Sequence, residues 1–146
     1  MYNKILVPLD GSALAEAVLP HAQALATSEE AEIILLRVSA DPAAEFSFSD
    51  PSLASSLIEG LEAESLTYLQ SIRARLQRAG LRSSFLIRQG AIAETILRVA
   101  DEVKADIIAM STHGRSGVSR WLLGSIANRV VNHSPIPVLL IRPQAQ

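Results

Sequence analysis

Apolar runs with little polar alternation recur along the chain and predict buried strands. Such runs predict strands at residues 4–9, 32–38, 106–110 and 135–142, and a further strand is expected at the more polar segment 81–88. A run without alternation is typical of a strand covered on both faces, as in a parallel sheet. Pro8 cannot donate a hydrogen bond to a neighbouring strand, so we expect pairing to fail at the end of the first run.

Apolar residues at helical spacing fill the intervals between these runs. A first helix is expected after Ser12, a good N-cap, and Pro20 inside it predicts a kink. A long helix is expected over residues 53–79, a third after Gly90 and a fourth over residues 124–133. Strands and helices therefore alternate from one end of the chain to the other.

This alternation predicts an α/β fold. We expect one domain over residues 1–146, a Rossmann-like open sheet of five parallel strands with helices on both faces. In such sheets ligands bind beyond the carboxyl ends of the strands, where the strand order reverses. Candidate chemistry is therefore sought at three strand ends, which are residues 9–11, 38–39 and 110–124.

Composition narrows the classes of protein further. The chain has no cysteine, which excludes disulfide scaffolds, thiolate zinc sites and cysteine nucleophiles. Its apolar runs are far shorter than the ~18 residues of a membrane span, so we expect no membrane association. No basic and apolar leader precedes the first strand, so we expect a cytoplasmic protein. A net charge of −2 argues against a nucleic-acid binder.

Charge is distributed unevenly along the chain. Residues 1–72 carry Lys4 and Arg37 against eleven acids, whereas residues 73–146 carry eleven bases against four acids. Acidic and basic ends of one long helix account for part of this asymmetry. They do not account for Arg115 and Arg120, which fall in a glycine-bearing loop.

That loop, residues 111–123, carries the clearest chemical signal. Gly114 lets the backbone approach a ligand closely. Gly124 and Ser125 stand where the last helix begins, and unpaired N–H groups there favour a phosphate. The same residues also suit a flexible loop followed by a capped helix, so spacing alone leaves both interpretations open. A Walker-type P-loop and a dinucleotide fingerprint are both missing.

Four segments, in order along the whole chain, together resemble the universal stress protein family. They read VPLDGS at residues 7–12, LLRVS at 35–39, STHGRSGVSRWLLGS at 111–125 and PIPVLLIRP at 135–143. The resemblance implies an adenine nucleotide alpha hydrolase-like fold and the ATP-binding subgroup, whose loop has the form Gly-x2-Gly-x9-Gly-Ser/Thr. Gly114, Gly124 and Ser125 match this form, and Ser111 replaces its first glycine.

The resemblance implies a role for each matching position. Asp10 would meet the ribose, or a Mg²⁺ or Mn²⁺ ion through water, and the backbone of Val38 would pair with the adenine edge. The remaining positions would form the pocket floor, flank the base or wrap the ribose and phosphates. The implied nucleotide-binding set is Pro8, Leu9, Asp10, Val38, Met110, Ser111, His113, Gly114, Arg115, Gly124, Ser125 and Ile126.

Structural interpretations of three of these residues remain open at this point. Asp10 also suits a cap for the helix that begins near Ser12. His113 also suits an ordinary loop, and the side chain of Val38 belongs to the core in either case.

The sequence offers little for catalysis. Phosphoryl transfer needs a base or water-positioning group and charge stabilisation, yet no second carboxylate accompanies Asp10 and the loop has no lysine. We therefore expect an ATP-binding stress-response protein that regulates interactions, with weak or no hydrolysis. Two alternatives stay open: a dimeric interaction module of the same fold that binds no nucleotide, and a slow ATPase or adenylyltransferase.

The last strand raises the question of a partner. Its residues are uniformly apolar, and chain order places it at a sheet edge, where an exposed apolar strand is an aggregation hazard. Pairing with a second copy removes that hazard, and the resemblance implies the same arrangement. We expect a homodimer through Val138, Leu139, Leu140 and Ile141.

Overall fold

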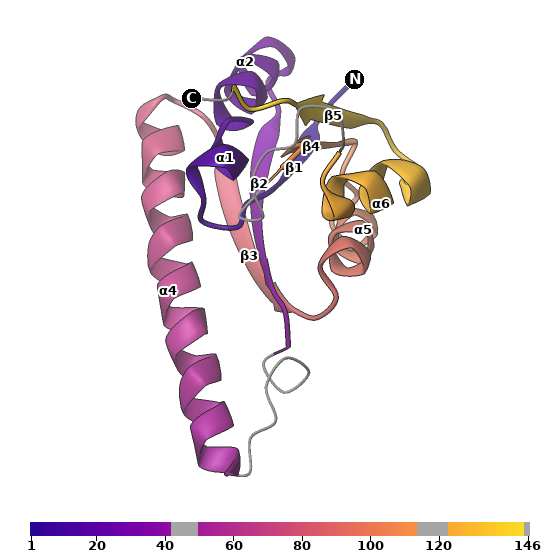
Figure 1. The fold of residues 1–146 in the computed structure, drawn as a ribbon. Helices are drawn as coiled ribbons and strands as arrows, with labels where there is room; N and C mark the ends of the chain where they lie inside the picture. Colours follow the sequence, from indigo (N-terminus) through magenta and orange to yellow (C-terminus); the bar gives the residue numbers. More distant parts are fainter. Residues whose placement is uncertain (42–49, 114–122, 145–146) are drawn as a thin grey trace.

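The computed structural model describes residues 1–41, 50–113 and 123–144 (Figure 1). Two residues of the expected nucleotide-binding set, Gly114 and Arg115, lie outside these ranges.

One parallel sheet organises the molecule. Its strands are β1 (Lys4–Pro8), β2 (Glu32–Ser39), β3 (Ser83–Gln89), β4 (Ile107–Ser111) and β5 (Val138–Ile141). Their order across the sheet is β3-β2-β1-β4-β5, and every neighbouring pair is parallel. The chain builds outward from β1 to β3, then crosses back to place β4 on the other side of β1. The predicted α/β fold is confirmed, and the strand order reverses between β1 and β4.

Helices cover both faces of the sheet (Figure 1). They are α1 (Ala13–Glu16), α2 (Leu19–Glu29), α4 (Pro51–Arg78), α5 (Ile92–Glu102) and α6 (Ser125–His133). Side chains of α1, α2 and α4 pack with one face, and those of α5 and α6 pack with the other. Along β1, Ile5 and Val7 join the first core while Leu6 joins the second, which is the alternation expected of a strand buried on both sides.

The first helix differs from the sequence prediction. We expected one helix kinked at Pro20, but the structure has two helices, α1 and α2, with Pro20 in the first turn of α2. A proline costs no hydrogen bond there, because the first N–H groups of a helix have no intrahelical acceptor. Ser12 caps α1 as predicted, since its Oγ accepts from the Ala15 N–H at 3.1 Å.

The long helix also begins earlier than predicted. It starts at Pro51 rather than at residue 53, because Asp50 caps it by accepting from the Ser52 N–H at 2.9 Å. Proline is well suited to the first helical position. Among the described residues, no helix, α4 included, is long and apolar enough to cross a membrane.

Candidate functional site

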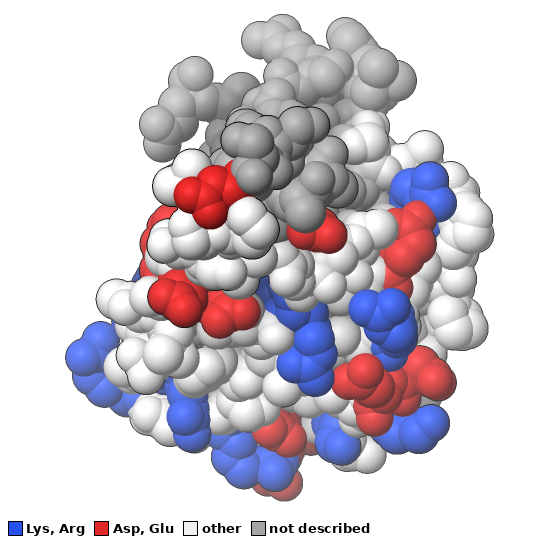
Figure 2. Space-filling model, turned by 90° about the horizontal axis from the view of Figure 1, so that it is seen from below, with Lys and Arg blue, Asp and Glu red and all other residues white. Residues whose placement is uncertain are grey.

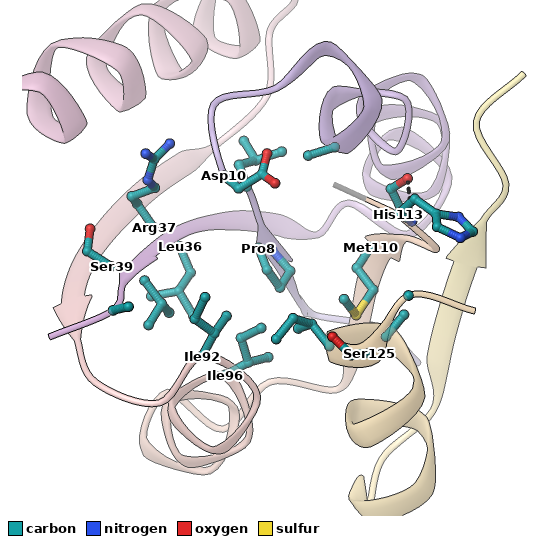
Figure 3. Close-up of a pocket in the computed structure, with 18 of the residues that line it drawn as sticks. Pro8, Asp10, Leu36, Arg37, Ser39, Ile92, Ile96, Met110, His113 and Ser125 are labelled. Carbon is teal, nitrogen blue, oxygen red and sulfur yellow. Dashed lines mark hydrogen bonds between the residues drawn. The ribbon is translucent and has the colours of Figure 1, made fainter. Parts of the chain in front are cut away.

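A cavity of about 510 Å³ opens at the carboxyl ends of β1, β2 and β4 (Figure 3). Its volume lies in the range of about 300–1,000 Å³ that is typical of small-molecule sites. Most of its wall is apolar. The apolar lining includes Pro8, Leu9, Leu36, Val38, Leu61, Ile92, Ile96, Met110 and Ile126.

Pro8 explains why the sheet parts at this point. β1 pairs with β2 as far as Pro8, but its register with β4 ends at Leu6. The Leu9 N–H donates to the Leu36 carbonyl of β2. The Lys4 carbonyl accepts from the Asp106 N–H, just before β4. The backbone N–H and C=O groups of the even-numbered residues in β1 therefore point toward β4. Pro8 is one of them and has no N–H to donate. The predicted failure of pairing therefore occurs on the β4 side, where the cavity lies.

Asp10 lies on the cavity wall in a fixed turn. Its Oδ1 accepts hydrogen bonds from the Ser12 N–H at 2.9 Å and from the Ser12 hydroxyl at 2.6 Å. Gly11 between them has φ of 89°, a conformation that favours glycine. Ser12, not Asp10, caps α1. The Asp10 carboxylate is thus oriented by its own turn while it borders the cavity.

The end of β4 forms a second, polar part of the wall. Ser111, Thr112 and His113 all border the cavity and are all buried. The Thr112 hydroxyl and His113 Nδ1 lie 3.0 Å apart in a hydrogen bond. Because His113 is only 7% exposed and its ring is held, it is not an ordinary exposed loop histidine.

The start of α6 forms the third part of the wall. The first intrahelical hydrogen bond there runs from the Asn128 N–H to the Gly124 carbonyl. The N–H groups of Ser125, Ile126 and Ala127 therefore precede the helical ladder, and all three residues border the cavity. Together with the positive end of the helix dipole, such N–H groups attract an anion.

Gly124 has a different role from the one expected. Its N–H, which we expected to face a phosphate, donates to the Thr112 carbonyl at 2.9 Å. A Cβ at this position would lie 2.7 Å from the same carbonyl oxygen. The residue is therefore a close-contact glycine that holds the start of α6 against the end of β4, and the N–H groups that precede the helical ladder begin at Ser125.

Arg37 is a site residue that sequence reasoning missed. It borders the cavity and is only 8% exposed, although it lies in an apolar strand. Its guanidinium carbon lies 5.9 Å from the centre of the Tyr68 ring. The available signal was a single charge inside a run predicted to be covered on both faces, because a buried charge requires compensation.

All ten described residues of the expected set border this one cavity. They are Pro8, Leu9, Asp10, Val38, Met110, Ser111, His113, Gly124, Ser125 and Ile126. Asp10 is the only carboxylate among the described lining residues, and no group of three or more metal-ligating side chains occurs in the described part of the chain.

The fold is shared with solved structures whose ligands are known. A universal stress protein in complex with cAMP superposes with a TM-score of 0.71 at 24% identity, covering 98% of each chain. A universal stress protein family protein of Arabidopsis thaliana with AMP bound has a TM-score of 0.71 at 18% identity, covering 98% of this chain and 93% of that one. At these identities the likeness establishes the fold alone.

A closer relative is the universal stress protein MJ0577 of Methanocaldococcus jannaschii. Its sequence is 30% identical over 97% of this chain and 96% of its own. Its solved structure superposes with a TM-score of 0.89 at 31% identity, covering 100% of this chain and 99% of that one. The universal stress protein family model matches residues 1–142. On sequence and fold together, the chain belongs to the universal stress protein family.

Proposed function

We propose that the cavity binds ATP or a closely related adenine nucleotide, and that the bound nucleotide regulates association with other proteins during stress. One observation carries the proposal. A single cavity joins apolar walls, which suit a base, to the open N-terminus of α6, which suits phosphates. The family neighbours that hold cAMP and AMP are consistent with this ligand class.

The described residues suggest an orientation for the ligand. The base would lie between Val38 and Met110, with the ribose at Asp10 and the outer phosphates at the N–H groups of Ser125 and Ile126. Gly114 and Arg115, outside the described residues, remain expected contacts. These assignments extend the resemblance and the geometry to a ligand and are part of the proposal.

A divalent ion fits this arrangement through the nucleotide. Mg²⁺ typically binds one or two carboxylates together with phosphate oxygens and retains several waters. Asp10 supplies one carboxylate at the cavity wall, so it would hold Mg²⁺ or Mn²⁺ through water. The ion would offset phosphate charge when bound. We propose weak or no hydrolysis, because the described lining offers a single carboxylate for the combined tasks of ion binding and water activation.

The oligomeric state and location are also proposals. Within residues 1–41, 50–113 and 123–144, β4 is the one strand that pairs with β5, so β5 is an edge strand that could pair with a second copy. We propose a cytoplasmic homodimer in which the two β5 strands, Val138–Ile141, pair about a twofold axis.

Calorimetry with ATP and magnesium tests the nucleotide proposal. Ser125→Asp places a carboxylate at the first position of α6, where it suits the helix dipole but repels phosphates. We expect ATP affinity to fall about tenfold or more while the helix is retained. Ser56→Asp, which adds the same charge at an exposed position of α4, is the matched control and is expected to bind like the wild type.

Three outcomes would favour the alternatives. Absence of heat at millimolar ATP, with no adenine nucleotide released from the denatured purified protein, favours an interaction module that binds no nucleotide. Phosphate release well above background that disappears in Asp10→Asn favours a slow ATPase, and transfer of AMP to a protein favours an adenylyltransferase.

A further inference from the structure

Arg37 presents a buried positive charge beside the cavity that the proposed function leaves unexplained. Its neighbours Leu36 and Val38 pack with the core beneath α5, so strand alternation sends Arg37 to the opposite face. Figure 3 shows it on the same side of the cavity as Asp10, with Ile92 and Ile96 opposite. Burying an arginine is costly unless other groups compensate its charge and hold it.

The Arg37 guanidinium packs against the ring of Tyr68. The guanidinium carbon lies 5.9 Å from the centre of the Tyr68 ring, within the range of a cation–π contact. The Tyr68 hydroxyl donates to Glu16 Oε2 at 2.9 Å, and Arg75 contacts the other oxygen of Glu16 at 3.4 Å. The ring is thus anchored between α1 and α4, and the Arg37 guanidinium lies against this anchored ring.

Asp10 and Arg37 belong to one electrostatic neighbourhood. Burial and the hydrogen bond to Glu16 raise the pKa of Tyr68 above its ordinary value. Among the smaller effects, Arg37 lowers that pKa and Asp10 raises it, so both charges lie close enough to influence the same hydroxyl. Of the described residues that line the cavity, Asp10 is the only carboxylate and Arg37 the only lysine or arginine.

The balance between the negative charge of Asp10 and the positive charge of Arg37 affects how an anionic ligand binds. A fixed carboxylate in a partly buried cavity repels phosphates, because charge interactions are stronger there than in water. On the face that Figure 2 shows, acidic and basic side chains of the described residues are interspersed. Among the described side chains that line the cavity, Asp10 and Arg37 therefore set the local charge balance, and they act in addition to the N–H groups at the start of α6.

We propose that Arg37 is a specificity-determining residue, which lets a cavity lined by a carboxylate accept phosphorylated ligands by offsetting the charge of Asp10. The inference rests on the proposed nucleotide site and goes beyond it. Arg37 acts on ligand charge from the cavity wall, so its contribution grows with the number of phosphates. A role limited to the packing of Tyr68 and α4 would instead affect all ligands equally.

The test compares adenosine, AMP and ATP by calorimetry in EDTA. For Arg37→Gln we expect adenosine affinity to stay within about twofold, AMP to weaken about threefold and ATP about tenfold or more. Asp10→Asn is expected to shift the preference the other way, toward ATP over adenosine. The double variant should restore the wild-type preference, because it removes both charges.

Arg88→Gln is the matched control. Arg88 lies opposite Val38 on β3, pairs with Glu102 and does not line the cavity, yet its substitution changes the net charge equally. We expect it to bind all three ligands like the wild type. Arg37→Lys retains the charge and should recover most of the ATP preference. Circular dichroism checks the fold of each variant, and Asp10→Asn alone still tests the idea if Arg37 variants do not fold.

The outcomes separate the two proposals. If the wild type binds none of the three ligands, the nucleotide site is refuted and this inference with it. If the wild type binds them but Arg37→Gln weakens all equally, or Asp10→Asn leaves the preference unchanged, only the role of Arg37 is refuted. That role is likewise refuted if Arg88→Gln reproduces the effect of Arg37→Gln.

Discussion

Gly124 and Gly60 offer a paired test of the packing, because the same substitution is expected to act in opposite directions. At Gly124 an added Cβ would lie 2.7 Å from the Thr112 carbonyl oxygen, and ordinary contact begins at 3.4 Å, so the two must separate by about 0.7 Å. The carbonyl oxygen belongs to the backbone and the position of a Cβ is set by the backbone, so neither atom can rotate away. The 2.9 Å hydrogen bond between the Gly124 N–H and the same oxygen would lengthen to about 3.6 Å and be lost.

The loss of stability expected for Gly124→Ala follows from this close contact and this hydrogen bond. A lost hydrogen bond costs about 0.5–1.5 kcal/mol, and alanine is poorer than glycine at an N-cap. Strain from the forced shift adds about 1–3 kcal/mol, so we expect destabilisation of about 2–4 kcal/mol. At Gly60, inside α4, a Cβ meets nothing within 4 Å. Gly60→Ala should therefore stabilise the protein by about 0.5–1 kcal/mol through helix propensity.

Urea unfolding measures both variants against the wild type. The urea concentration at the unfolding midpoint should fall for Gly124→Ala and rise for Gly60→Ala. The slope of the unfolding free energy against urea concentration should stay unchanged for both. If Gly124→Ala unfolds at the wild-type midpoint, the start of α6 does not lie against the end of β4 as described. Destabilisation of both variants by the same amount would show that the close contact at Gly124 carries no cost of its own.

Three further predictions concern the core, the Tyr68 anchor and the sheet edge. Leu69→Ala should cost about 2–5 kcal/mol because Leu69 is fully buried, whereas Leu53→Ala, at 58% exposure, should change stability by less than about 0.5 kcal/mol in urea unfolding. Because the pKa of Tyr68 is raised, the stabilisation from its neutral phenol is complete below its ordinary value of about 10 and is lost as the pH rises above it. Unfolding curves between pH 9 and 12 should show a steeper loss of stability for the wild type than for Tyr68→Phe, and equal slopes would contradict this. Light scattering at micromolar concentration should give twice the chain mass of 15.7 kDa, and a strict monomer would rule out the proposed β5 dimer.

The sequence predicted most of the sheet because short apolar runs without polar alternation are typical of strands buried on both faces. The five strands lie where the sequence places them, although β5 is shorter than expected and covers only Val138–Ile141. Pro20 was placed correctly in the chain but misinterpreted, since the pattern does not show that two helices rather than one precede β2. A proline inside a helical pattern is compatible with a kink or with a new start, and only packing decides between them.

The candidate site was predictable in its residues but not in all its contacts. The motifs at the strand ends identified the cavity wall because parallel strands deliver their carboxyl ends to one edge. They did not show that the Gly124 N–H is used by the Thr112 carbonyl, which depends on how closely α6 approaches β4. Arg37 was missed because its partner Tyr68 lies 31 positions along the chain, and no local pattern joins them.

The proline at the end of β1 has a consequence for how such a site tolerates change. If the register continued, Pro8 would lie opposite Met110, and any other residue there would offer β4 the hydrogen-bond donor that is missing. The two strands could then pair over more residues, which would narrow the opening of the cavity between them. The separation of β1 and β4 beside the cavity thus depends in part on a backbone N–H that Pro8 lacks, and not only on the side chains that line the cavity.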